Sequence, residues 1–520
     1  MTRKMRTGLR AVALSVVGLL TAVTVTACGP AGSESEGGLD QGVLDIGLSA
    51  EPKSNPPAVD SSVVGYTIDA LVQRGLMAYD PDGKLIPGLA ESVTSKDNRT
   101  WTVKLRPGLT FANGDPLTTA DVKRNFEYMS DPKSPGYVFD GLKGLTSMEV
   151  ESDTRMKLVL DSPNNAFAQY LAIPAAAIYS KDSIKDKKDG WDGAGPFKVD
   201  TYSPGQSLRL VKNDAYYGAD QVDLKTINLK FYPDGNARTS ALLSGDVDFI
   251  DYVPWEDFSR LESDKNMTLD SQNGPFMYTL FNVKTGIFDD PKMRQAVAYA
   301  INRDNSVSAA FFGHGESQYG VPMDKSDPAY DPKWDKLYSY DPDKARQLIK
   351  ESGFDTSKEI NFLTNSQYVF HRDVALSIQA DLEAVGLKIK LNSPDWATRT
   401  ELSNKGDYDL LINGNVGVVT DPSYMGTFFG GPLSNVRSAH YQNPELQQLV
   451  KEGAAAKDGA AKKRIYDKMR GQVQADTPFV MVNTRGQAHA YTNEVKGFKT
   501  LPGFLSFYSG YSLAYIKGGQ

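Results

Sequence analysis

Hydrophobic and polar positions alternate with a period of two in "TWTVKLRPG". Trp101, Val103 and Leu105 are apolar, while the residues between them are polar or charged. This alternation predicts a half-buried strand, which Pro107 and Gly108 end. The next stretch, "TTADVKRNFEYM", predicts a helix whose N-cap is Thr119.

Other stretches carry the period of 3.6 that is typical of amphipathic helices. "DDPKMRQAVAYAINR" begins with a capping Asp289 or Asp290 and with Pro291 in the first turn. "DPDKARQLIKESG" has the same arrangement, with Asp341 as cap and Gly353 as stop. "RDVALSIQADLEAVGLKIKL" predicts a helix that ends near Gly386 and a short strand after it. One face of the first helix gathers apolar residues, namely Met293, Ala296, Val297, Ala300 and Ile301. The mixture predicts an α/β fold.

The N-terminal residues have a different pattern. Four basic residues, Arg3, Lys4, Arg6 and Arg10, precede an apolar run from Ala11 to about Val25, and small residues follow. A basic start, an apolar run and small residues are the three parts of a secretory signal, predicted here for residues 1–27. The apolar run is shorter than the roughly 20 residues that a transmembrane helix needs, and no second apolar stretch of that length follows.

Cys28, directly after this signal, is the only cysteine in 520 residues. No disulfide can therefore form within the chain. The stretch "VTAC" resembles a bacterial lipobox, which implies cleavage before Cys28 and lipidation of that cysteine. Residues 28–40 are rich in glycine, serine and acidic residues, and we expect them to form a flexible tether.

The charge excludes one class of partner. The net charge is −7, and removal of the four positive charges of the signal makes it −11. Nucleic-acid-binding surfaces are usually basic, so we expect no nucleic-acid partner. The roughly 490 remaining residues exceed what one hydrophobic core usually serves, which predicts two or three lobes.

The motifs of common enzyme classes are missing. The sequence contains no HExxH, no GxSxG and no GxxxxGK[ST], and its four histidines (His314, His371, His440 and His489) do not stand at metal-ligand spacing. We therefore expect no catalytic activity, no metal and no cofactor. A hydrolase whose catalytic residues come from distant positions remains an alternative of another class.

Several longer stretches occur in the order found in one known family. These are "LIPGLAESVTSKDNRTWTVKLRPGLTFANGDPLTTADVKRNFEYM", "GAGPFKVDTYSPGQSLRLVKNDAYYG", "LLSGDVDFIDYVP" and "LFNVKTGIFDDPKMRQAVAYAINR", with "YQNPELQQLV" and "TPFVMVNTRGQAHAYTNEVKGF" towards the C-terminus. Together they resemble the extracellular solute-binding proteins of ABC importers, in the oligopeptide, dipeptide and nickel-binding family (family 5). The resemblance covers roughly residues 41–515.

The resemblance implies a periplasmic-binding-protein-like fold, with two α/β lobes joined by a hinge, an extra small lobe and a ligand cleft between lobes. Carried onto this chain, lobe I comprises residues 41–74, 194–285 and 481–520. The small lobe II comprises residues 75–193, and lobe III comprises residues 286–480. It also implies an extracellular, lipid-anchored and monomeric receptor that delivers its solute to an ABC permease.

Residues 408–437 bear on the identity of the solute. Peptide-binding relatives have a tryptophan, an acidic residue and a tyrosine here, and the acidic residue pairs with the α-ammonium of the peptide. In this sequence the three aligned positions hold Asn415, Val418 and Val419. A buried ammonium without a counter-charge costs several kcal/mol. We therefore expect an oligosaccharide or another polar non-peptide solute, while a peptide receptor remains the alternative and a nickel chelate a lesser one.

The candidate ligand contacts follow from side-chain chemistry. Asparagine amides both donate and accept hydrogen bonds, and tryptophan rings can stack on sugars. An arginine can grip a carboxylate or phosphate with two hydrogen bonds. The expected ligand-binding residues are Trp255, Tyr278, Trp396, Asn413, Asn415, Asp421 and Arg437.

Overall fold

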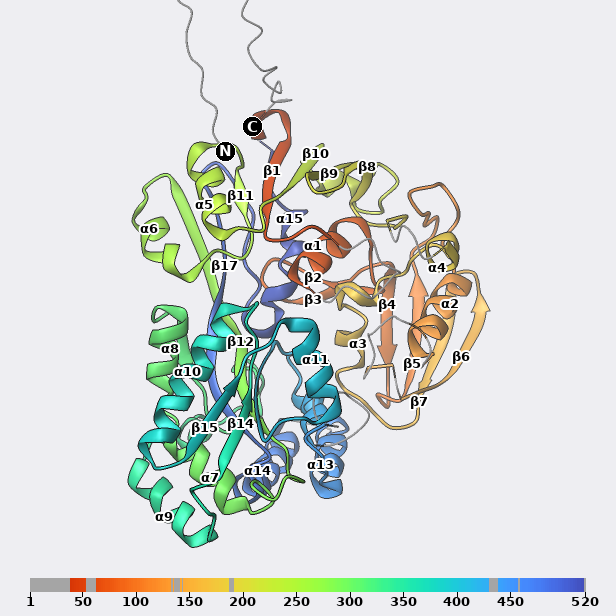
Figure 1. Ribbon diagram of the computed structural model, residues 1–520. Helices are drawn as coiled ribbons and strands as arrows, with labels where there is room; N and C mark the ends of the chain where they lie inside the picture. Colours follow the sequence, from red (N-terminus) through yellow and green to blue (C-terminus); the bar gives the residue numbers. More distant parts are fainter. Residues whose placement is uncertain are drawn as a thin grey trace, which may run out of the picture. The chain divides into compact units, whose positions relative to one another are not determined.

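The computed structural model describes residues 38–52, 62–131, 134, 141–142, 144–186, 191–429, 438–456 and 459–518. Cys28, the predicted signal and most of the predicted tether lie outside these residues, and so does Arg437. The described residues form three β-sheets with helices packed on them (Figure 1). This mixed α/β composition confirms the predicted fold class.

The largest sheet has eleven strands and contains most of the chain's long-range pairings. Ten of them lie in the order β15 (Lys388–Asn392), β14 (Glu359–Leu363), β16 (Leu410–Asn415), β12 (Met267–Phe281), β17 (Phe479–Thr492), β11 (Phe249–Ile250), β1 (Val43–Leu48), β10 (Thr226–Phe231), β9 (Ser207–Lys212) and β8 (Phe197–Ser203). The eleventh, β13 (Gly315–Ser317), pairs with β17.

Two strands of this sheet are unusually long and lie at its centre. β12 has 15 residues and β17 has 14, and they pair antiparallel from Met267 opposite Thr492 to Leu280 opposite Phe479. In Figure 1 they run through the molecule from the part that holds β1 to the part that holds β14. The register shifts between Asn273 and Phe276, so the pairing bends near its middle.

On each side of this central pair the sheet contains a set of parallel strands. β1 pairs parallel with both β10 and β11, and we call these three the first strand set. β14 pairs parallel with both β15 and β16, and these form the second strand set. Parallel strands are joined by crossovers, which here include the helices that cover the sheet.

Helices cover both strand sets, and the cores lie beneath them. In one buried cluster, residues from α7 (Pro291–Ala300), α9 (Pro342–Ser352) and α10 (Val369–Ala384) pack on β12, β14 and β16. A second cluster packs α1 (Val63–Val72) against β1 and β10. The helices beside the second set are α7 (Pro291–Ala300), α8 (Arg303–Phe311), α9 (Pro342–Ser352), α10 (Val369–Ala384), α11 (Trp396–Lys405), α13 (Pro444–Ala454) and α14 (Gly459–Asp476). The others in these parts are α1 (Val63–Val72), α5 (Gly235–Ser244), α6 (Phe258–Ser263) and α15 (Gly510–Leu513).

A separate four-stranded antiparallel sheet lies within residues 75–193. Its order is β4 (Ala90–Ser95), β5 (Thr100–Leu105), β7 (Arg155–Leu160) and β6 (Leu145–Ser152), and α2 (Thr119–Ser130), α3 (Phe167–Tyr170) and α4 (Lys181–Asp186) accompany it. Trp101 packs against Phe167 at 5.5 Å between ring centroids. A short hairpin of β2 (Met77–Tyr79) and β3 (Leu85–Pro87) precedes this sheet.

The locally predicted elements are confirmed with one correction. Trp101, Val103 and Leu105 are buried in β5, and Asp290 and Asp341 cap α7 and α9. The N-cap of α2 is Thr118 rather than Thr119, because the Asp121 carboxylate accepts the Thr118 backbone N–H at 2.9 Å in a capping box. No helix among the described residues is long and apolar enough to span a membrane.

Candidate functional site

The carboxyl ends of the two strand sets hold three of the seven expected ligand-binding residues, namely Trp255, Trp396 and Asn415. In the second set, Asn415 is the last residue of β16, and Trp396 begins α11 shortly after β15. In the first set, Trp255 follows β11 and begins a short 3-10 helix, Trp255–Asp257. Ligands of open α/β sheets bind outside the carboxyl ends of parallel strands, so these positions form a candidate binding site.

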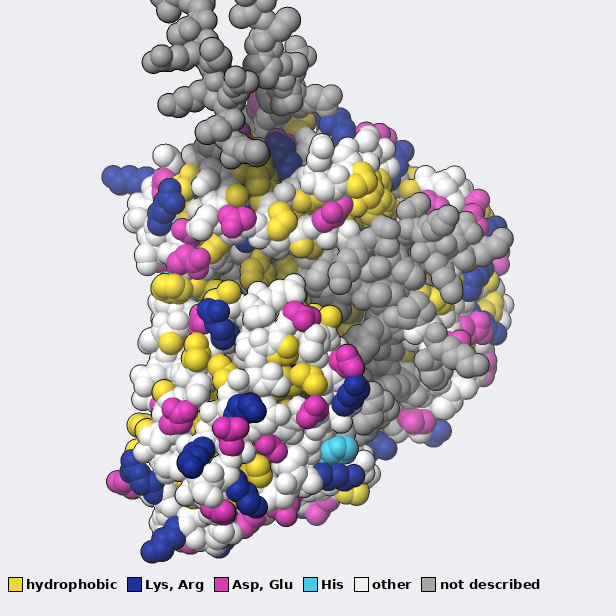
Figure 2. All heavy atoms as spheres, viewed as in Figure 1, with side chains coloured by type: hydrophobic (Ala, Val, Ile, Leu, Met, Phe, Trp, Pro, Cys, Tyr) yellow, Lys and Arg dark blue, Asp and Glu magenta, His cyan; other side chains and the backbone are white. Residues whose placement is uncertain are grey.

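A continuous row of ring contacts joins the two strand sets. Trp255 lies 5.4 Å from Phe370 between ring centroids, Phe370 lies 4.7 Å from His371, and His371 lies 6.1 Å from Trp396. Phe370 and His371 belong to the first turn of α10, which follows β14. On the face shown in Figure 2, hydrophobic side chains follow the recessed band between the upper and lower parts of the surface. The two predicted tryptophans therefore belong to one aromatic row.

Tyr278 and Asn413 lie beside this row, in the core of the sheet. They are opposite each other in the pairing of β12 with β16, and the Asn413 amide donates to the Tyr278 hydroxyl at 2.8 Å. The Asn413 side-chain oxygen accepts from the Arg399 guanidinium at 2.9 Å. Tyr278 is fully buried and Asn413 is nearly so. Both polar ends of the Asn413 amide thus have partners inside the protein.

Asp421 is held in a turn and in an ion pair. Its carboxylate caps the 3-10 helix Pro422–Phe428 by accepting the Ser423 N–H at 2.8 Å, and it lies 2.7 Å from the Lys462 ammonium. Asp327 lies at the same distance from Lys462. The Asp421 carboxylate is therefore already engaged within the protein, by the Lys462 ammonium and by the Ser423 N–H.

Val418 is the residue that the sequence comparison above aligned with the acidic position expected in peptide-binding relatives. Its side chain is 37% exposed, and its backbone carbonyl accepts a hydrogen bond from the Tyr508 hydroxyl at 2.8 Å. The neighbouring Gly417 packs directly on Phe504, since a Cβ there would lie 2.0 Å from the Phe504 ring. These contacts fix the backbone and leave the Val418 side chain free.

Basic residues that were not predicted from the sequence surround the aromatic row. Arg399, from α11, lies over Trp396 with its guanidinium carbon 4.9 Å from the ring centroid. Arg485, from β17, lies 5.6 Å from the centroid of Trp255 and 4.9 Å from that of Phe370. Burial lowers the pKa of His371 to about 3, and the positive charges of Arg399 and Arg485 act in the same direction. His371 is therefore neutral at physiological pH.

Arg485 could have been found from the sequence. It interrupts a strand whose flanks, "FVMV" and "AHAY", are apolar, small or aromatic. A charged residue inside such a strand is buried and needs a partner. Arg399 gives no such signal, because its sequence surroundings in α11 are polar.

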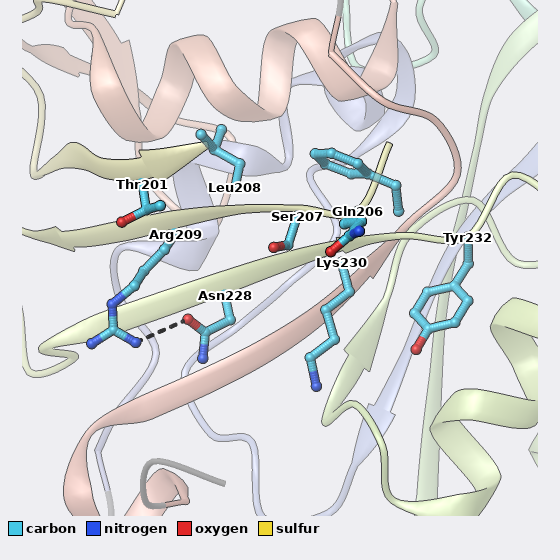
Figure 3. A pocket seen from close by; sticks show the side chains of 9 residues that line it. Thr201, Gln206, Ser207, Leu208, Arg209, Asn228, Lys230 and Tyr232 are labelled. Carbon is cyan, nitrogen blue, oxygen red and sulfur yellow. Dashed lines mark hydrogen bonds between the residues drawn. The ribbon is translucent and has the colours of Figure 1, made fainter. Parts of the chain in front are cut away.

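A pocket of about 540 Å³ lies elsewhere, on β8, β9 and β10 (Figure 3). None of the expected ligand-binding residues that the structure describes lines it. Arg209 lies 3.4 Å from the Asn228 side-chain oxygen and 3.3 Å from Asp200, and Lys230 lies 2.8 Å from Asp45. Because carboxylates of the protein already balance its two cations, this pocket is the weaker candidate for a charged solute. Among the described residues, no group of three or more His, Cys, Asp or Glu side chains could hold a metal ion.

Comparison with known proteins assigns the family. The model of the bacterial extracellular solute-binding proteins, family 5 Middle, matches residues 84–435, well over half of the 520 residues. The chain belongs to this family. Its members are solute-binding receptors of ABC importers that act outside the cytoplasmic membrane, and this confirms the resemblance seen in the sequence.

Individual relatives differ in what they bind. The glutathione-binding protein GsiB of Pectobacterium atrosepticum is 28% identical over 459 residues, which are 85% of this chain and 88% of that protein. The structure of AgaA from A. tumefacien R10, in complex with agropinic acid, has 34% identity and a TM-score of 0.83, and the match covers 92% of this chain and 98% of that one. DppA from Helicobacter pylori, in complex with the peptide STSA, has the same fold at 22% identity, with a TM-score of 0.79 and coverage of 92% and 98%.

Proposed function

We propose that this protein is a lipid-anchored receptor that captures a small, polar, non-peptide solute and delivers it to an ABC permease. The observation that carries the proposal is the contact between Trp255 and Phe370, 5.4 Å between ring centroids, which joins the carboxyl ends of the two strand sets. A solute between these ends would contact both sets at once.

The surroundings of Val418 support a solute that has no free ammonium. No carboxylate occurs between residues 410 and 420, and the carboxylate of Asp421 is paired with Lys462. The relative AgaA, solved with agropinic acid, agrees with a non-peptide solute. GsiB, named for glutathione binding, favours the peptide alternative. An oligosaccharide remains within the proposal, because the half-buried Trp255 and Trp396 rings and the Asn415 amide suit hydroxyl groups.

The lobe boundaries stated above are part of the proposal, with the hinge at the chain crossings near Gly195 and Val283. Gly195 donates its N–H to the Val72 carbonyl at 2.9 Å, and a Cβ at this position would lie 2.5 Å from the Val72 backbone. Val283 follows β12 and donates to the Ala439 carbonyl at 3.1 Å. Closure of the lobes around the solute would be the signal that the permease reads. Lipidation of Cys28 would hold the receptor at the membrane, with at least two acyl chains needed for a stable anchor.

Isothermal titration calorimetry tests the choice of solute. The protein, unfolded and refolded to remove bound molecules, is titrated with di- to pentapeptides, with the same peptides acetylated at the amino group, with neutral oligosaccharides and with agropinic acid. We expect a non-peptide compound to bind most tightly. If a peptide binds with sub-micromolar affinity and acetylation of its amino group abolishes this binding, the proposal is overturned and the peptide alternative is established.

A further inference from the structure

Arg485 is a buried cation whose guanidinium is only partly used by the protein. The side chain is 6% exposed, and Nη1 donates to the Tyr252 hydroxyl at 2.9 Å. Nε is buried and has no hydrogen-bond partner, and no carboxylate within the described part of the chain forms an ion pair with Arg485. The edge formed by Nε and Nη2 therefore makes no hydrogen bond to the described residues, although Nη1 of the same guanidinium does.

The rings around Arg485 make a missing counter-charge costly. The guanidinium carbon lies 4.9 Å from the Phe370 ring centroid and between 5.6 and 5.8 Å from those of Tyr252, Trp255 and Phe507. Aromatic faces attract a cation but also keep water away from it. An ion pair made in such surroundings is stronger than one made in water.

A second arginine on the same row adds to the positive charge. Arg399 is also 6% exposed, donates to the Ile412 carbonyl and to Asn413, and has a buried Nε without a partner. Among the described ion pairs it has no carboxylate either. His371, between the two arginines in the row, is neutral and offers no compensating charge. The carboxyl ends of the strand sets thus carry two buried positive charges.

Two other buried arginines of the protein, Arg294 and Arg303, have an evident structural role. Arg294 donates to backbone carbonyls of Phe288, Asp289, Asp476 and Thr477. Arg303 donates to five carbonyls on four segments of the chain. Such arginines hold loops together, whereas Arg485 holds none with its Nε–Nη2 edge.

We propose that Arg485 binds a carboxylate of the solute through its Nε–Nη2 edge, so that the receptor selects a polar acid over the corresponding neutral molecule. The inference rests on the proposed function, because it needs a solute between the carboxyl ends of the strand sets. Arginine and carboxylate match in geometry and form two parallel hydrogen bonds. Arg399 would add long-range attraction, with its guanidinium held by Asn413.

Matched pairs of ligands and variants test the proposal. The wild type, Arg485→Gln and Arg485→Met are titrated with agropinic acid, galacturonic acid and glutathione, and with galactose and glutathione dimethyl ester as neutral counterparts. We expect each acid that binds the wild type to do so with an affinity about a hundredfold higher than that of its neutral counterpart. Each Arg485 variant should bind the acid more weakly by a similar factor. Arg346→Gln is the control, since Arg346 is half-exposed on α9 and pairs with Asp343, and it should bind within about twofold of the wild type. Equal affinity for acid and neutral forms, or unchanged binding by both variants, would overturn the proposal.

A second measurement needs no ligand. If Arg485 lacks a counter-charge in the empty receptor, Arg485→Met should unfold at a higher temperature than the wild type, while a purely structural role predicts a lower one. A lower unfolding temperature for both variants would overturn the inference even if no compound of the panel binds. The result is separate from the test of function. Tight binding of a free peptide would refute the non-peptide solute, and the variants would still decide whether Arg485 binds a carboxylate.

Discussion

The Lys462 ammonium lies 2.7 Å from the Asp421 carboxylate, and the Asp327 carboxylate lies at the same distance from that ammonium. The three side chains are at most 12% exposed, so the single positive charge separates two negative ones in a poorly hydrated place. This arrangement holds the turn that follows Val418, and it explains why Asp421 serves the fold before it serves a ligand.

Replacing Lys462 with methionine should therefore destabilise the protein markedly. The two carboxylates would face each other unbalanced, and breaking a buried pair costs about 3–5 kcal/mol. Urea unfolding measures this free energy. Lys463→Met is the matched control: Lys463 pairs with Asp331 and Asp467 but is 38% exposed, so its loss should cost less than about 1 kcal/mol. Equal losses for the two variants would contradict this account.

Val418→Asp should give the receptor an affinity for peptides with a free amino group. The new carboxylate would stand where peptide-binding relatives have theirs, and it would be partly exposed, so we expect a gain of about tenfold. Calorimetry with a tripeptide and its acetylated form measures the difference. Val418→Asn has nearly the same shape and no charge, and it should give no gain. If the two variants bind the tripeptide equally, the missing charge at residue 418 does not decide peptide binding.

Gly417→Ala should destabilise the protein by about 1–3 kcal/mol, because its Cβ would overlap the Phe504 ring at 2.0 Å and overpacking carries such a cost. Gly471→Ala, in the middle of α14, has open space around the new Cβ and should stabilise the protein by about 0.5–1 kcal/mol. Thermal and urea unfolding of both variants provide the comparison. A neutral Gly417→Ala would mean that the loop moves away from Phe504 at no cost.

Asp381 should make stability depend on pH. Burial raises the pKa of its carboxyl from 3.8 to about 6, although the Asn302 N–H donates to it at 2.8 Å and acts in the opposite direction. The folded protein thus binds this proton more tightly than the unfolded chain. The resulting stabilisation is complete below about pH 4 and is lost as the pH rises through about 6.

Asp381→Asn should remove this dependence while keeping an acceptor for Asn302. The difference in the free energy of unfolding, wild type minus variant, should decrease as the pH rises from about 4 to about 7. Urea unfolding at several pH values measures this difference. Asp343→Asn, at a side chain that is 93% exposed, is the control and should show a smaller change. A difference that stays constant with pH would refute the assignment.

Cys28→Ala should abolish membrane anchoring. Under the proposed anchoring the lipid is attached to the cysteine itself, so the variant should appear in the medium or remain unprocessed. Cell fractionation and detergent partitioning, with mass spectrometry of the N-terminus, make the measurement. Ser33→Ala, within the predicted tether, is the control and should remain anchored. A processed Cys28→Ala protein that still partitions into detergent would exclude anchoring through Cys28.

Local chemistry made much of the fold predictable. Asp290 and Asp341 cap their helices by accepting backbone N–H groups two or three residues further along the chain, and a proline follows each of them. Such a cap depends only on neighbouring residues, so the sequence is enough to predict it. The strand that contains Trp101 and Val103 was predictable because apolar and polar residues alternate along it. The site was harder to predict, because it depends on the β12–β17 pairing, which joins segments of the chain that are far apart in the sequence. Trp255 and Trp396 were chosen for their chemistry, but only the folded chain places Phe370, His371 and Arg485 between or beside them.

The position of β17 also governs when the fold can be completed. Among the strands that the structure describes, β17 alone pairs with both β11 and β12, so the two halves of the large sheet are hydrogen-bonded through it, and it comes from residues 479–492 of 520. A ribosome must therefore synthesise nearly the whole chain before those halves can join. Until then the edges of β11 and β12 remain unpaired, and such edges attract other chains. The nascent protein has a long period in which a chaperone or an export machinery can hold it unfolded.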